Sequence, residues 1–277
     1  MNHRNDHYQV VIVKYGTRET VRSDVYLNYP LYHEADAPIG MDYFFWIIRN
    51  LQRTVVVDTG FSRRGGEARN RTFLASVPEL FEQLGVDPKQ SPDVILTHAH
   101  YDHTGNLSLF PTSRVIMAKQ EFAFWSSRHA HRVLFHHAVE DEDLAFLTEA
   151  AQQGRLSLFS DSFEVAPGIE VVVVGGHTPG QSVVKVQTDD GVVLLASDAI
   201  HYYEEYEADK LFVTVADLVE MYEGFDQIRE MESAGTIRHL VSGHDPDTLN
   251  RFTPVTGELA GLVATIGTLD DATPEVA

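Results

Sequence analysis

Short runs rich in apolar and β-branched residues, separated by turn residues, dominate the chain. Such runs are typical of strands whose two faces are both covered. They lie at residues 8–15, 43–48, 54–57, 93–96, 169–174, 182–187, 192–196 and 239–241. Asp189-Asp190-Gly191 joins two of them and predicts a hairpin turn. The pattern therefore predicts a protein rich in β-sheet.

Helical spacing of apolar residues is confined to four stretches. Residues 77–84 predict one helix, and residues 217–233 predict a longer one with a single apolar stripe. Residues 119–153 predict two or three helical pieces, and this stretch is long enough to cap an active site. A weakly apolar stretch, residues 259–266, also predicts a helix. Since no solenoid repeat and no low-complexity linker interrupts the chain, one domain spanning residues 1–277 is the simplest organisation.

Residues 23–40 contain two prolines and a glycine and are predicted to form a loop. This loop carries three tyrosines that could either pack the rim of the protein or line a substrate cleft, namely Tyr26, Tyr29 and Tyr32.

Composition and charge restrict the possible partners. The net charge of −20 argues against nucleic-acid binding, which relies on Lys and Arg, and it favours a neutral or mono-anionic small molecule over a polyanion. No stretch has the roughly 20 consecutive apolar residues of a membrane span, and residues 1–7 lack the apolar core of a secretory signal. The chain has no cysteine, so any metal must be held by His, Asp or Glu. We therefore expect a cytoplasmic protein that binds neither membranes nor nucleic acid.

Candidate metal ligands are most concentrated in the His-Ala-His-Tyr-Asp-His segment, residues 98–103, directly after a predicted strand. Imidazole nitrogen and carboxylate oxygen are ligands that zinc and similar cations favour. Alternate residues of an extended segment point the same way, so His98 and His100 are placed to share one metal. Asp102 and His103 follow one turn later and are better placed for a second metal. The alternative interpretation is a polar loop that is rich in histidine by chance.

Three further candidate ligands also come directly after predicted strands, namely His177, Asp198 and His244. Loops at one edge of a layered sheet can converge, and metal sites are often built there. Each of these residues alone could be structural, but together with the 98–103 segment they predict a metal site. Asp58 closes the strand predicted at residues 54–57, and we expect it to orient a ligating imidazole rather than to bind metal itself.

Four more histidines lie within residues 119–153, namely His129, His131, His136 and His137. They form either a further metal site or scattered surface imidazoles, and we expect the latter.

These motifs resemble those of the metallo-β-lactamase superfamily. The resemblance rests on the 98–103 segment, on Gly-His-Thr-Pro-Gly around His177, on Ser-Asp-Ala around Asp198 and on Gly-His-Asp around His244. It extends from about Tyr43 to Pro246 and includes Asp58-Thr59-Gly60. It implies an α/β fold, the αββα sandwich, in which two mixed β-sheets are flanked by helices. It also implies two divalent metal ions, zinc by default, with iron, manganese or cobalt as alternatives. The implied ligands are His98, His100 and His177 for one metal and Asp102, His103 and His244 for the other, with Asp198 bridging.

Within the superfamily the chain is most similar to N-acyl-homoserine-lactone lactonases. All the expected ligands are present, including the bridging Asp198, and too few residues follow His244 for the extra helical domain of glyoxalase II. The resemblance implies opening of a lactone ring, such as that of a quorum-sensing N-acyl homoserine lactone, by a hydroxide that bridges the two metals. Asp102 could relay a proton in this reaction.

The resemblance breaks at one position that matters for the substrate. Many such lactonases have a tyrosine three residues after the bridging aspartate, where this chain has His201, followed by Tyr202 and Tyr203. His201 or Tyr202 could hydrogen-bond the lactone carbonyl and Tyr203 could contact the substrate, or all three could simply pack their loop. The alternatives for function are hydrolysis of another lactone, a thioester or an amide, and a metal-binding module without catalysis. A homodimer is expected from the base rate among soluble enzymes.

Overall fold

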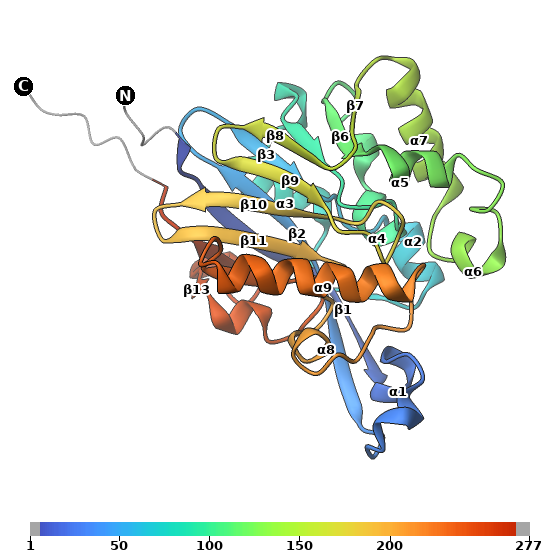
Figure 1. The fold of residues 1–277 in the computed structure, drawn as a ribbon. Helices are drawn as coiled ribbons and strands as arrows, with labels where there is room; N and C mark the ends of the chain where they lie inside the picture. Colours follow the sequence, from blue (N-terminus) through green and yellow to red (C-terminus); the bar gives the residue numbers. More distant parts are fainter. Residues whose placement is uncertain (1–5, 270–277) are drawn as a thin grey trace, which may run out of the picture.

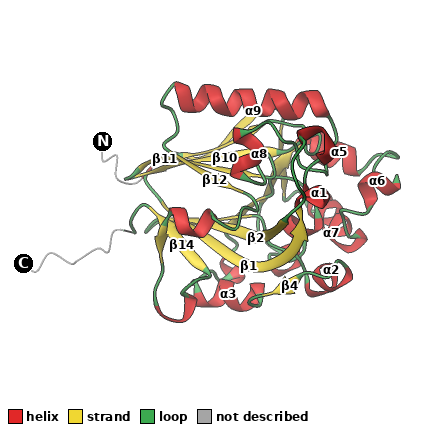
Figure 2. Cartoon of the chain, turned by 90° about the horizontal axis from the view of Figure 1, so that it is seen from below, coloured by secondary structure: helices red, strands yellow, loops and turns green. Residues whose placement is uncertain are grey.

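The apolar runs form two β-sheets stacked face to face, with helices on both outer surfaces, in the computed structural model of the chain (Figures 1 and 2). The structure describes residues 6–269. The first five residues of the N-terminal segment, which we predict not to be a secretory signal, and the last eight of the chain lie outside the described residues.

Within the described residues the larger sheet has nine strands in the order β13-β14-β1-β2-β3-β5-β6-β7, and β4 pairs with β1. Strands β3, β5, β6 and β7 are parallel, and the remaining neighbours are antiparallel. The bounds are β1 Gln9–Val21, β2 Pro38–Arg49, β3 Thr54–Val57, β4 Thr72–Phe73, β5 Asp93–Ile95, β6 Val115–Ala118, β7 Leu156–Phe159, β13 Thr253–Pro254 and β14 Val263–Ile266.

The smaller sheet has five described strands in the order β12-β11-β10-β9-β8. Only β11 and β12 are parallel in it. Because β10 is antiparallel to both β9 and β11, the strands β9, β11 and β12 end at the same edge of the sheet. The bounds are β8 Ser162–Ala166, β9 Ile169–Val173, β10 Ser182–Thr188, β11 Gly191–Ser197 and β12 His239–Ser242.

Helices cover the outer face of each sheet, and an apolar cluster lies between each sheet and its helices. On the smaller sheet, Met221, Phe225 and Ile228 of α9 are buried in one cluster with Leu194 of β11. On the larger sheet, α3, α5 and α7 contribute to a second cluster, in which Phe81 lies 4.6 Å from the ring of Phe45. The helix bounds are α1 Arg22–Val25, α2 Arg63–Ala68, α3 Val77–Gln83, α4 Tyr101–Thr104, α5 Lys119–Trp125, α6 Val133–His136, α7 Asp141–Gln152, α8 Tyr203–Glu207 and α9 Leu218–Ser233.

The third apolar cluster lies between the two sheets, where β-branched residues of both inner faces interdigitate. The predicted αββα sandwich with two mixed sheets is thereby confirmed. Among the described residues no helix has the length and apolar character needed to cross a membrane.

The prediction of a helix over residues 259–266 is wrong. Val263–Ile266 form strand β14, which pairs with β1 so that Val10 lies opposite Ile266. The edge of β1 supplies backbone hydrogen-bond partners that a weakly apolar segment of β-branched residues satisfies better as a strand than as a helix. The predicted loop at residues 23–40 also contains a short helix, α1, and its last residues belong to β2.

Candidate metal centre and active site

Every predicted metal ligand lies at the edge of the sandwich where strands β5, β9, β11 and β12 end. His98 and His100 follow β5, and the next turn, helix α4, carries Asp102 and His103. The three remaining predicted ligands follow β9, β11 and β12 in turn, namely His177, Asp198 and His244. The fold therefore brings residues from distant parts of the sequence to one point between the two sheets.

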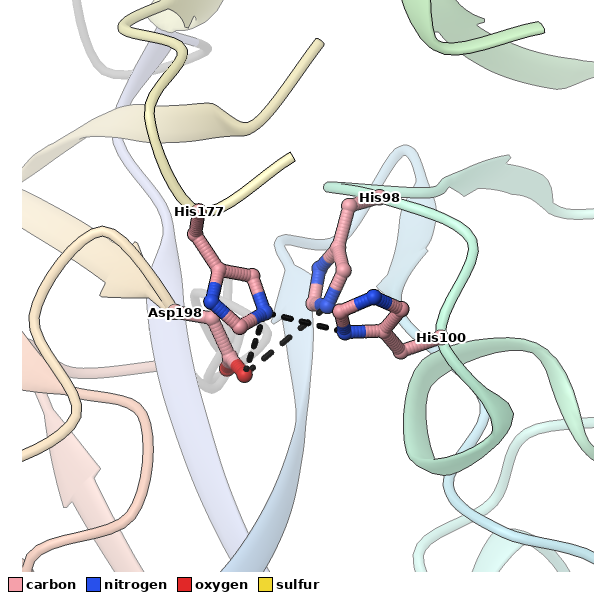
Figure 3. A group of neighbouring side chains, drawn as sticks. All are labelled: His98, His100, His177 and Asp198. Carbon is pink, nitrogen blue, oxygen red and sulfur yellow. Dashed lines mark hydrogen bonds and ion pairs between the residues drawn. The ribbon is translucent and has the colours of Figure 1, made fainter. Parts of the chain in front are cut away.

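One ligand group consists of His98, His100, His177 and Asp198, whose candidate ligand atoms all lie within 4.8 Å of one another. Figure 3 shows the three imidazoles and the carboxylate turned toward a common centre. Nε2 of His177 lies 2.9 Å from Nδ1 of His100 and 3.4 Å from Oδ2 of Asp198. Three imidazoles and one carboxylate at this spacing form a donor set suited to a divalent cation.

A second group consists of Asp102, His103 and His244, again within 4.8 Å of one another. Asp198 connects it with the first group. Its Oδ1 lies 3.2 Å from Nε2 of His103 and 3.1 Å from Nε2 of His244, whereas its Oδ2 faces His177. The two oxygens of one carboxylate are thus divided between the two groups.

Backbone carbonyls hold two of the imidazoles in a fixed orientation. Nδ1 of His177 donates to the carbonyl of Thr214 at 2.7 Å, and Nδ1 of His244 donates to the carbonyl of Asp42 at 2.7 Å. Because a carbonyl oxygen can only accept, the proton is on Nδ1 and the lone pair of Nε2 is directed inward. Metal-binding histidines are commonly oriented in this way.

Asp58 orients a third imidazole. Its Oδ2 accepts a hydrogen bond of 2.7 Å from Nδ1 of His103, and its two oxygens also accept from the N–H and hydroxyl of Thr97. Asp58 is fully buried, and its backbone adopts the left-handed conformation, with φ of 59°. A non-glycine residue in this region carries strain that tertiary contacts must support, and here the contacts are those with Thr97 and His103.

The inward-facing atoms fit two metal ions. Nε2 of His98, His103 and His244 and Oδ1 of Asp198 are buried and form no well-aligned hydrogen bond among the described residues, although Oδ1 of Asp198 lies 3.1–3.2 Å from two of these nitrogens. Buried imidazole nitrogens and a carboxylate oxygen gathered at one point are donors that suit divalent cations. Burial, together with the neighbouring imidazoles, lowers the pKa of His98 well below its usual range, and burial lowers the pKa of His177 to about 3. Both imidazoles are therefore neutral, which is the form that binds metal.

Glu121, at the start of α5, is a residue of the site that the sequence analysis missed. It is fully buried, and its Oε1 accepts hydrogen bonds from the N–H of Ala99 at 2.9 Å and from Nε1 of Trp125 at 2.7 Å. Its Oε2 accepts from the N–H of Gly180 at 2.8 Å. One carboxylate thus ties the loop that carries His98 to the loop that follows His177. Burial raises the pKa of Glu121 despite these donors.

His201 lies beside the bridging carboxylate. Its Nε2 is 3.2 Å from Oδ2 of Asp198, its Nδ1 is 3.0 Å from Oε2 of Glu205, and its ring stacks on Phe212 with a centroid distance of 3.9 Å. Burial lowers the pKa of His201, but the carboxylates of Glu205 and Asp198 outweigh this effect and raise it to about 9.

The two tyrosines after His201 are turned to other partners. The hydroxyl of Tyr202 donates to the carbonyl of Gly40 at 3.1 Å, and that of Tyr203 donates to the carbonyl of Leu240 at 3.2 Å. Tyr26, Tyr29 and Tyr32 pack in series, with Tyr26 also 6.0 Å from the ring of Tyr202. Two cavities, described in the next paragraph, open beside the ligand groups. None of these five tyrosines is among the described residues that line them. Their contact with a substrate stays a prediction.

Two cavities open beside the ligand groups, and both reach His100 and His177. The first, about 440 Å³, is the more polar of the two and is called the polar cavity below; its lining includes Asp102, Asp198, Tyr43, Tyr101, Arg18, Arg69 and Arg71. The second, about 680 Å³, is mainly apolar, and its lining includes Phe124, Trp125, Leu134, Phe135 and Leu218. Of the four histidines at 129–137, only His137 lines these cavities, and the candidate metal groups found among the described residues contain none of the four.

The chain is similar to known proteins over most of its length. A family model of the metallo-beta-lactamase superfamily matches residues 42–244. An N-acyl homoserine lactonase of a Bacillus species is 22% identical over 216 residues, which cover 73% of this chain and 77% of the relative. The crystal structure of a quorum-quenching N-acyl homoserine lactone lactonase superposes with a TM-score of 0.71 at 18% identity, covering 86% of this chain and 92% of that one.

A second solved structure is AidC, a dizinc quorum-quenching lactonase in complex with a product, N-hexanoyl-L-homoserine. It superposes with a TM-score of 0.68 at 18% identity over 95% of both chains. These relatives and structural neighbours are metal-dependent hydrolases. The family match covers all the ligand positions described above, and the chain belongs to the metallo-beta-lactamase superfamily.

Proposed function

We propose that this protein is a dinuclear metal-dependent hydrolase that opens lactone rings, with N-acyl homoserine lactones as the first substrates to test. The observation that carries the proposal is the convergence of the ligand groups, with their unpartnered nitrogens, at the junction of two cavities. A structural metal site is normally closed, so open space beside both groups favours catalysis over a non-catalytic metal module.

The apolar cavity supports a substrate with an acyl chain. Helices α5 and α6 supply part of its wall, where Trp125, Leu134 and Phe135 face the same space as the ligand His177. Residues 213–216 and Leu218 supply another part. We propose that residues 119–153 form a cap over the site within a single domain. The curated relatives are named as lactonases of N-acylated substrates, which agrees with such a cavity.

The ligand side chains would hold two divalent ions, and such ions polarise a carbonyl group and lower the pKa of water toward neutrality. The His and Asp donor set fits zinc, and iron, manganese and cobalt use similar ligands. The chain itself fixes the orientation of the imidazoles through Thr214, Asp42 and Asp58. Asp102 lines the polar cavity, and we assign it the transfer of a proton toward the leaving oxygen.

For the hydrogen bond to the developing oxyanion, His201 has better support than Tyr202. Neither residue lines the two cavities, but Nε2 of His201 lies 3.2 Å from Oδ2 of Asp198, which does line the first cavity, whereas the hydroxyl of Tyr202 donates to Gly40. We expect His201→Phe to lower kcat by roughly 10²- to 10³-fold, the usual cost of losing one oxyanion donor. Tyr202→Phe should change kcat by less than about threefold.

The test is ring opening of a panel of N-acyl homoserine lactones, followed as proton release, with a thioester and a β-lactam alongside. We expect turnover of the lactones by the metal-loaded protein, loss of turnover with a chelator and in His103→Ala, and full activity in His131→Ala, whose imidazole belongs to neither ligand group. Binding of about two metal equivalents with hydrolysis of the thioester and not of the lactones would contradict the proposed substrate class while leaving the metal site intact.

A further inference from the structure

We propose that Arg18 and Arg71 form an anion-binding wall of the active site, and that the preferred substrate is a lactone carrying a carboxylate in addition to an apolar arm. This inference rests on the proposed lactonase function and narrows its substrate class. Both arginines line the polar cavity together with Asp102 and Asp198.

The two arginines come from neighbouring segments of the larger sheet. Arg18 lies on β1, and Arg71 directly precedes β4, which pairs with β1 so that Gly16 lies opposite Phe73 and Thr17 opposite Thr72. Because both side chains line the same cavity, that cavity has two positive charges on its wall.

Among the described residues no carboxylate forms an ion pair with either arginine. Nε of Arg18 is buried and has no hydrogen-bond partner. Arg71 donates from Nε to the hydroxyl of Tyr101 at 2.9 Å and from NH1 to the carbonyl of Arg69 at 2.7 Å, and both acceptors are neutral. The contrast is Arg69 in the same cavity, which forms an ion pair of 2.5 Å with Glu140.

The carboxylates around the cavity form no ion pair with this positive wall among the described residues, although the charge of Asp102 acts on Arg71. Asp102 and Asp198 belong to the ligand groups, and Asp24 is exposed and makes no ion pair in the described part of the chain. A planar carboxylate matches the fork of a guanidinium in two parallel hydrogen bonds. A polyanion is disfavoured at long range because the chain as a whole carries a net charge of −20.

The position of the arginines relative to the apolar cavity defines the shape of the substrate. The polar and the apolar cavity meet at His100 and His177, which belong to the first ligand group. A molecule whose scissile carbonyl lies at the ligands can therefore extend an apolar arm toward Phe135 and an anionic arm toward Arg18. An N-acyl homoserine lactone with a plain alkyl tail would use only the first of these.

The experiment compares two lactones that differ in one charge, namely an alkyl-substituted γ-butyrolactone with a ring carboxylate and the same lactone with the carboxylate converted to a primary amide. We expect the wild-type, metal-loaded protein to favour the acid in kcat/KM by roughly tenfold or more. Arg18→Met should bring the ratio close to one by slowing the acid alone, and Arg18→Lys should keep part of the preference. The matched control is Arg63→Met on α2, an exposed residue outside the cavity lining whose replacement removes the same charge from the chain.

Ligand binding gives a readout that does not depend on turnover. We expect the acid, and not the amide, to raise the Tm of the wild-type protein with and without added metal, and Arg18→Met to lose this response. Since the buried Nε of Arg18 has no hydrogen-bond partner among the described residues, the Tm of free Arg18→Met should equal or exceed that of the wild type. An acid-to-amide ratio near one in the wild type, or an unchanged ratio in Arg18→Met, would overturn the inference.

The two proposals fail in distinguishable ways. If neither lactone and no N-acyl homoserine lactone is hydrolysed, the lactonase function is wrong, and a Tm response that is specific to the acid and lost in Arg18→Met still supports the anion-binding wall. If both lactones are hydrolysed equally well, the lactonase function stands and the anion-binding wall is wrong. A large loss of Tm in free Arg18→Met, without loss in Arg63→Met, would instead assign Arg18 a structural role.

Discussion

Glu121→Gln tests how the first ligand group is held in place. The carboxylate of Glu121 accepts hydrogen bonds from Ala99, Trp125 and Gly180, and it connects the loops that follow β5 and β9. Gln has nearly the same shape but one acceptor oxygen in place of two. If that oxygen keeps the bonds from Ala99 and Trp125, the amide NH₂ is directed at the N–H of Gly180, and two donors then face each other.

The expected loss in free energy of unfolding follows from these three hydrogen bonds. A buried donor without an acceptor costs about 1–3 kcal/mol, and a hydrogen bond to a charged acceptor exceeds one to a neutral acceptor by roughly 1 kcal/mol. Replacing the carboxylate also removes a buried charge, whose desolvation raises the pKa of Glu121, and this offsets part of the loss. We therefore expect Glu121→Gln to lower the free energy of unfolding by about 2–4 kcal/mol.

The functional effect should fall on metal binding. Residues that orient metal ligands typically change metal affinity by about 10- to 100-fold when they are replaced. A competition titration with a chromophoric chelator measures this, with urea unfolding of the metal-free protein alongside. The matched control is Glu79→Gln, an exposed glutamate of α3. Unchanged metal affinity and unchanged unfolding in Glu121→Gln would refute the idea that this carboxylate positions the ligand loops.

Three further substitutions test other parts of the site and its cap. Burial, with the charge of Glu140, raises the pKa of Asp143 from 3.8 to about 7, so the wild type should lose about 4 kcal/mol of stability from this group as the pH rises from 4 to 8. The stability difference between Asp143→Asn and wild type in urea should therefore grow with pH, and a difference independent of pH would contradict this. Asp58→Asn should weaken binding of one metal equivalent by about 10- to 100-fold, because the ring of His103 loses its charged partner; equal loss of both equivalents in a chelator titration would contradict this. Leu134→Ala should raise KM for long-chain lactones by roughly three- to tenfold and leave short-chain ones unchanged, because only a long chain buries against it in the apolar cavity; an equal effect on both chain lengths would mean that the acyl chain binds elsewhere.

The candidate ligands could be predicted from the sequence because metal binding restricts the residue types and because each ligand follows a strand. His177 and His244 lie far apart in the chain, but both come directly after apolar runs. The strand pattern then implied that they meet at one edge of a sheet. The structure brings them to the two ligand groups expected from the family resemblance.

Glu121 and strand β14 could not be predicted from the sequence pattern. Glu121 lies in a helical stretch where an acidic residue is usually exposed, and its burial depends on how α5 sits against two loops. Strand β14 was missed because its partner, β1, is near the other end of the chain. Both depend on long-range packing, which local patterns do not report.

The net charge of the chain and the local charge of the active-site wall differ in sign. A net charge of −20 predicts that polyanions are repelled at a distance and is compatible with a mono-anion, but it gave no reason to expect a positive cavity wall. The wall arises because Arg18 on β1 and Arg71, directly before β4, line one cavity, while their neighbour Arg69 is neutralised by Glu140. Long-range potential depends on the sum of the charges, but recognition within a few ångströms depends on which charges lack a partner. An acidic protein can therefore bind a small mono-anion at one point, and the unpaired guanidinium of Arg18 is where we expect this one to do so.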